Sequence, residues 1–149
     1  MISPSKLKPN LTKLNLKKTL KIATLLSGID AVEQAFNRLK IDTKIIFACD
    51  NNNFVKQSYY ANYDITEENW YSDILNLNAD KYKNKVDILV GGSPCQSFSS
   101  VGKRKGLEDD RGNLIYEFIR IVQESEPNVF IFENVKGLTT HDNGKTWKD

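Results

Sequence analysis

Short apolar runs alternate with amphipathic segments along this chain. The runs at 21–26, 44–48, 86–91 and 129–132 are typical of strands buried in a parallel sheet, and a shorter strand is predicted at 70–74. Apolar residues at helical spacing predict helices after the first, second and fourth strands. The predicted core faces of these helices are Val32, Phe36 and Leu39; Phe54, Val55 and Tyr59; and Leu114, Ile115, Phe118, Ile119 and Val122.

This alternation predicts an α/β fold with a mostly parallel, doubly wound sheet and helices on both faces. The polar, lysine-rich segment 76–85 is predicted to be a connector. The order of the elements puts the switch point of the sheet between strands 21–26 and 86–91. Proteins of this type bind ligands at the carboxyl ends of the strands beside that point. Functional residues are therefore expected where the strands end.

A cysteine and a glutamate follow the ends of two predicted strands. Strand 86–91 runs into Gly92, Ser93 and Pro94, and the fixed φ of this proline restrains the backbone just before Cys95. Strand 129–132 runs directly into Glu133. We therefore expect a thiol and a carboxylate to face one cleft. The alternative for Cys95, considered by itself, is a small buried hydrophobic residue.

The segment 93–111 has no apolar periodicity but carries glycines and basic residues. Loops of this length inside compact domains are usually functional or disordered. The basic side chains are Lys103, Arg104, Lys105 and Arg111. They predict a loop that closes over a nucleic acid and contacts its phosphates, with an ordinary solvated basic loop as the alternative.

Three motifs together resemble the cytosine-5 DNA methyltransferase family. They are the run from Pro94 through Cys95, Gln96 and Ser97 to Ser99; the basic, glycine-containing loop from Gly102 to Gly112; and the run Glu133, Asn134, Val135 and Lys136. The run from Lys21 to Glu33 is similar to the first motif of the family. The resemblance implies a Rossmann-like methyltransferase fold, of which this chain would carry the first five strands. Thr24, Asp30 and Asn51 depart from the family's frequent aspartate, glycine and aromatic residue.

The resemblance implies a pocket for S-adenosylmethionine. Its residues would be Leu26, Ser27, Gly28, Ile29, Asp50, Asn51, Asp73, Ile74, Pro94 and Leu114. An acidic residue at the end of the second strand also suits ribose hydroxyls on physical grounds, and a helix N-cap is the alternative for Asp50. The resemblance further implies that Cys95 adds to C6 of a flipped cytosine, that Glu133 hydrogen-bonds the base, and that Gln96 and Ser99 contact the DNA.

Composition adds bounds to this picture. The chain has 149 residues, 40% of them hydrophobic, and a formal net charge of +2, which suits one domain without a membrane span. Residues 1–19 carry five lysines and no acid and are predicted to be a flexible basic tail before a methyltransferase portion at 20–149. Two cysteines and one histidine predict neither a disulfide framework nor a metal site, and Cys49 is interpreted as a packing residue.

The resemblance covers only the first half of the family pattern. No Gln-x-Arg-x-Arg segment and no target recognition domain follow in this sequence. We therefore expect a fragment of a DNA (cytosine-5)-methyltransferase that is inactive without a complementary polypeptide. Its expected setting is a cytoplasmic restriction-modification system of a bacterium or phage, with double-stranded DNA as substrate. The alternatives are a transfer RNA cytosine-5 methyltransferase and a non-catalytic remnant.

Overall fold

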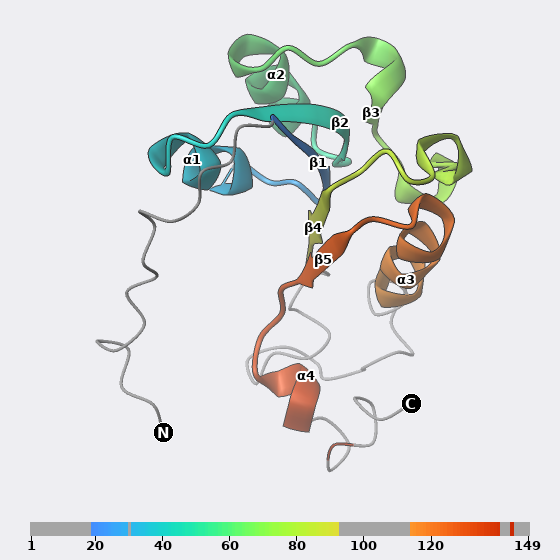
Figure 1. The fold of residues 1–149 in the computed structure, drawn as a ribbon. Coiled ribbons are helices and arrows are strands. Elements are labelled where there is room, and N and C mark those ends of the chain that lie inside the picture. The colour runs from blue at the N-terminus through green and yellow to red at the C-terminus, as the bar shows by residue number, and fades with distance from the viewer. Residues whose placement is uncertain (1–18, 30, 93–113, 141–143, 145–149) are drawn as a thin grey trace.

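A five-stranded parallel sheet forms the centre of the computed structural model, which describes residues 19–29, 31–92, 114–140 and 144 (Figure 1). The order of its strands is β3-β2-β1-β4-β5, and every neighbouring pair is parallel. The strands are β1 (Leu20–Leu25), β2 (Thr43–Cys49), β3 (Trp70–Tyr71), β4 (Ile88–Gly91) and β5 (Val129–Phe132). Because β1 lies between β2 and β4, the switch point is where the sequence predicts it.

Helices cover both faces of the sheet, which confirms the predicted doubly wound α/β architecture (Figure 1). The helices α1 (Ala31–Arg38) and α2 (Asn53–Asn62) lie on one face, and α3 (Leu114–Ser125) lies on the other. Successive strand residues alternate between these layers. Ala48 packs in the cluster with Val55 of α2, whereas Cys49 packs in the cluster with Phe118 of α3. A short helix, α4 (Gly137–Thr140), follows β5.

The predicted core faces of the first two helices are partly wrong. Leu39 and Phe54 are exposed, while Glu33 is a buried residue of α1. Leu39 comes after the end of α1. Phe54 lies about 100° around α2 from Val55, and α2 buries the stripe of Val55 and Tyr59. The predicted core face of α3 is wrong at Ile119, which is exposed, and the buried apolar residues of this helix are Phe118 and Ile121.

The segment between β3 and β4 is more ordered than the predicted polar connector. It contains the 3₁₀ helices η4 (Ile74–Asn76) and η5 (Asp80–Tyr82), and η3 (Glu67–Asn69) precedes β3. Leu77, Ala79 and Tyr82 are buried from this segment. The guanidinium of Arg120 on α3 donates to the backbone oxygens of Ile74 at 3.0 Å and Leu77 at 2.9 Å. The side chain of Arg120 thus supplies hydrogen bonds to carbonyl groups of this irregular backbone, in addition to the bond that the Ile74 oxygen accepts from the Leu77 N–H.

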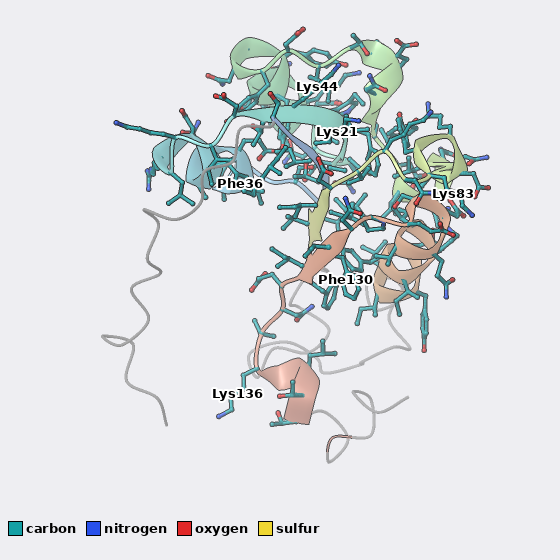
Figure 2. All side chains as sticks on the ribbon, in the orientation of Figure 1. Lys21, Phe36, Lys44, Lys83, Phe130 and Lys136 are labelled. Atoms are coloured by element: carbon teal, nitrogen blue, oxygen red, sulfur yellow. The ribbon has the colours of Figure 1, made fainter. Side chains whose placement is uncertain are left out.

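The strand β5 is an edge strand with much apolar surface exposed. Val129, Phe130 and Ile131 are each at least 50% exposed, and Phe130 is labelled in Figure 2. Because successive side chains alternate between faces, both faces of this strand are partly exposed, although Phe130 and Phe132 also contact Phe118 of α3. Within the described part of the chain, no helix is long and apolar enough to cross a membrane.

Candidate functional site

The turn after β1 has an unusual backbone. Leu26 has φ 54° and Gly28 has φ 58°, both in the left-handed region. A Cβ on Gly28 would meet no heavy atom within 4 Å, so glycine suits this position through its backbone freedom rather than through lack of space. For Leu26, which has a large side chain, the same region is disfavoured. The turn therefore depends on its surroundings to keep this shape.

Asp50, directly after β2, fastens two backbone segments. Its Oδ2 accepts a hydrogen bond from the Gly28 N–H and its Oδ1 accepts one from the Asn52 N–H, both at 2.9 Å. The N-cap of α2 is Asn52, whose Oδ1 accepts from the Phe54 N–H, so the alternative reading of Asp50 as the helix cap is wrong. A carboxylate offers about four acceptor positions. The remaining two acceptor positions of the Asp50 carboxylate are available to hydroxyl donors.

A cavity of about 330 Å³ opens beside this turn. Five of the predicted cofactor residues line it, together with Cys49 and Ser72. The five are Leu26, Asn51, Asp73, Ile74 and Leu114. Ser27, Gly28 and Asp50 adjoin it through the turn and the end of β2. Ile29 is exposed and is not among its lining residues, and Pro94 lies outside the described residues.

Cys49 and Ser72 are the lining residues that sequence reasoning missed. Burial raises the pKa of the Cys49 thiol to about 12, and the carboxylates of Asp50 and Asp73 add to this shift. The thiol is therefore neutral at physiological pH, in agreement with a packing role, although it also faces the cavity. The positions of the two residues, at the end of β2 and just after β3, are the signal that could have revealed them.

The lining is chemically suited to S-adenosylmethionine. Leu26, Ile74 and Leu114 supply apolar surface for a flat base. Asp73 caps η4, with its Oδ1 accepting from the Leu75 N–H at 2.9 Å, so its carboxylate is held in one place. Two carboxylates at the strand ends suit ribose hydroxyls and a positively charged sulfonium. The described residues contain no cluster of three or more His, Cys, Asp or Glu that could hold a metal ion.

Glu133 lies at the carboxyl end of β5, beside β4. Its N–H donates to the Gly91 carbonyl oxygen at 2.9 Å. A Cβ placed on Gly92 would lie 3.1 Å from the Glu133 Oε2. The predicted catalytic carboxylate thus borders the residue that leads into 93–113. The other predicted residues of that segment, Cys95, Gln96, Ser99, Lys103, Arg104, Lys105 and Arg111, lie outside the described residues.

Comparison with known proteins gives a family and a set of relatives. Residues 20–149 match the family model described as C-5 cytosine-specific DNA methylase. The orphan methyltransferase M.SPRI of Bacillus phage SPR is 38% identical over 127 residues, which is 85% of this chain and 29% of the relative. The type II methyltransferase M.BsuFI of Bacillus subtilis is 36% identical over 139 residues, 93% of this chain and 32% of the relative. The chain therefore spans about a third of the length of these relatives.

Solved structures share the fold. A variant of Spodoptera frugiperda DNMT2 superposes with a TM-score of 0.61 at 30% identity, covering 83% of this chain and 38% of the other. The methyltransferase EhMeth of Entamoeba histolytica gives a TM-score of 0.67 at 16% identity, covering 89% and 42%, which supports the fold alone.

Proposed function

Because the chain belongs to the C-5 cytosine-specific DNA methylase family, we propose that it carries the cofactor pocket and the nucleophile of a DNA cytosine-5 methyltransferase. The observation that carries this proposal is the cavity between Leu26, Asp73 and Leu114, which opens at the same sheet edge that bears Glu133. The relatives include a phage methyltransferase and a bacterial type II methyltransferase, which supports a phage or restriction-modification setting for this chain.

S-adenosylmethionine is the methyl donor of this family and supplies an electrophilic methyl group on a sulfonium. In the proposed complex, Ile74 and Leu114 contact the adenine, and the remaining acceptor positions of Asp50 bind ribose hydroxyls. Asp73, fixed by its bond to the Leu75 N–H, borders the adenine. Leu26 and Gly28 form the floor of the pocket.

The proposed chemistry begins with the Cys95 thiolate. A sulfur–carbon bond forms at C6 of the flipped cytosine, the 5,6 double bond opens, and C5 becomes nucleophilic. Glu133 holds a proton at N3, where negative charge would otherwise accumulate. Transfer of the methyl group to C5 would leave a neutral thioether on the cofactor. C5 then loses its proton to solvent, the bond between Cys95 and C6 breaks, and the 5,6 double bond re-forms. The N3 proton returns to Glu133, so that the products are 5-methylcytosine and the regenerated Cys95 thiolate.

Double-stranded DNA is the proposed substrate. Lys103, Arg104, Lys105 and Arg111 would contact its phosphates, and Gln96 and Ser99 would contact the DNA around the flipped base. The relatives are about three times longer than this chain. We therefore propose that residues 1–149 methylate DNA only together with further polypeptide that orients the cytosine and selects the target sequence.

The experiment has a binding arm and an activity arm. S-adenosylmethionine is titrated into residues 1–149 while amide NMR signals of Leu26, Asp50 and Ile74 are followed. We expect weak, saturable binding. If the amide signals of these residues did not shift, the proposed pocket would be contradicted.

Methyl transfer is then measured on DNA and on transfer RNA. The enzyme is residues 1–149, either alone or together with a polypeptide that spans the remaining length of M.SPRI. We expect activity on DNA only with the added polypeptide. Transfer by the chain alone, or to transfer RNA only, would contradict the proposal.

A further inference from the structure

The backbone of Leu26 is strained, and Leu26 faces the candidate cofactor cavity. Its φ of 54° is unfavourable for a residue that has a Cβ atom, and such conformations persist only where the surroundings enforce them. In this conformation Leu26 is one of the residues that line the cavity. Some structure next to the turn must therefore offset the strain.

A chain of hydrogen bonds reaches this turn from the helices on one face of the sheet. The Tyr59 hydroxyl on α2 donates to the Glu33 Oε1 on α1 at 2.8 Å and lies 3.1 Å from the Thr24 Oγ1 on β1. The Thr24 Oγ1 in turn lies 2.8 Å from the Ser27 Oγ. The Ser27 hydroxyl and N–H both donate to the Cys49 backbone oxygen, at 3.2 and 3.1 Å.

The part of this hydrogen-bond chain formed by Glu33, Tyr59 and Thr24 is shielded from water, and Ser27 is half-buried. Glu33 and Thr24 are 2% exposed and Tyr59 is fully buried. The Tyr59 ring packs against Trp70, with ring centroids 5.3 Å apart. Buried polar groups must keep their partners, because no water replaces a lost one. Burial therefore restrains Thr24, and Thr24 restrains the half-buried Ser27 through the 2.8 Å contact between their hydroxyls.

We propose that Tyr59 is a positioning residue that holds the turn 26–28, and with it Leu26, in the shape that binds the cofactor. The inference rests on the proposed cofactor pocket. The Tyr59 hydroxyl connects Glu33 to Thr24, so without it Thr24 and Ser27 can rotate to other partners. Leu26 then relaxes toward negative φ and withdraws from the cavity wall. Tyr59 itself is not a lining residue and acts through the turn.

The test compares Tyr59→Phe with Tyr60→Phe. The control removes a neighbouring tyrosine hydroxyl that also donates to a glutamate, Glu67, at 2.8 Å, but on the exposed side of α2. Amide hydrogen exchange is measured at Ser27 and Gly28, with Phe47 in the core as the reference for global stability. In Tyr59→Phe we expect exchange at the turn to rise about tenfold relative to Phe47. The three-bond coupling constant between the amide and α protons of Leu26 should change toward the value expected for a negative φ.

Cofactor affinity provides the functional arm. Tyr59→Phe should weaken binding of S-adenosylmethionine about fivefold or more, a coupling of ordinary size, and Tyr60→Phe should not. Should Tyr59→Phe fail to fold, Thr24→Val breaks the same chain between Tyr59 and Ser27, while Thr24→Ser keeps the hydroxyl and should retain affinity.

Three outcomes separate the possibilities. Unchanged exchange and coupling at the turn in Tyr59→Phe would overturn the inference. Equal acceleration at Ser27, Gly28 and Phe47 would also overturn it, because the network would then serve global stability alone. If the wild-type chain does not bind S-adenosylmethionine, the proposed pocket fails, and the exchange arm alone decides whether Tyr59 holds the turn.

Discussion

A methyl group on Gly92 would lie 2.5 Å from the backbone oxygen of Glu133. The end of β4 and the segment after β5 thus approach closely enough that only glycine fits between them. The Glu133 carboxylate also lies beside Gly92, with its Oε2 3.1 Å from the same added methyl group.

The substitution Gly92→Ala should therefore displace the segment that carries Glu133. Because the nearest atom is a backbone oxygen, the clash cannot be relieved by rotating a side chain, and we expect a loss of stability of about 1–3 kcal/mol. Urea unfolding measures this loss. An unchanged midpoint with unchanged amide signals at Glu133 and Asn134 would contradict the close approach.

Gly28 presents the opposite case, because space around it is open and only its φ is demanding. Gly28→Ala should cost about 1 kcal/mol of stability, and Gly28→Asn less, because asparagine tolerates the left-handed region. At Gly92 the order should reverse, with Asn more damaging than Ala. Unfolding midpoints of the four variants test this crossing pattern, and a common order at both positions would disprove it.

Cys95→Ser should abolish both methyl transfer and the covalent complex with DNA containing 5-fluorocytosine, where fluorine blocks the last elimination. The expected loss of rate exceeds about 10³-fold, because the hydroxyl is a far weaker nucleophile. Cys49→Ser is the matched control and should retain the adduct. The measurement uses the chain together with the polypeptide that restores activity. If the adduct formed with Cys95→Ser and disappeared with Cys49→Ser, the nucleophile would be Cys49, and the proposed role of Cys95 would be wrong.

Glu133→Gln should keep the fold and lose most of the methylation rate. The amide has nearly the shape of the carboxyl group but cannot hold or transfer the proton at N3, so we expect a decrease of about 10²-fold or more. Initial rates of the complemented enzyme give the effect, and amide NMR spectra check the fold. Glu126→Gln, on the surface after α3, serves as control, and an equal loss there would point to a general charge effect.

The buried thiol of Cys49 predicts a pH dependence of stability. Its pKa in the folded protein is raised from 9.0 to about 12, so above pH 9 the unfolded chain has lost the proton that the folded chain keeps. The free energy of unfolding should therefore fall as pH rises, by up to about 1.4 kcal/mol per pH unit. Urea unfolding at pH 8, 9 and 10 measures the slope. Cys49→Ala should have a shallower slope over this range, and an equal slope would show that other groups cause it.

The sequence predicts the sheet well because short apolar runs and their order suffice to specify a parallel α/β arrangement. The resemblance also anticipates Leu26, Asn51, Asp73, Ile74 and Leu114 at one cavity. The burial of Glu33 could not be predicted, because charged residues are mostly exposed and its partner Tyr59 comes 26 positions later. The folded connector between β3 and β4 was missed for a similar reason, since Arg120, which binds its carbonyl groups, is more than 40 positions away.

The contacts of Arg120 affect the ligand selectivity of the cavity. It joins the backbone beside Ile74 to α3, the helix that begins with Leu114, and Glu117 and Glu124 hold its guanidinium at 2.7 and 2.8 Å. Arg120 thus links two of the segments that line the cavity, and we expect them to move together. We expect the empty and filled cavities to have the same width, so little ordering entropy is lost on binding. Selection among adenosine-like molecules then becomes a matter of size, because a bulkier analogue meets walls that do not part.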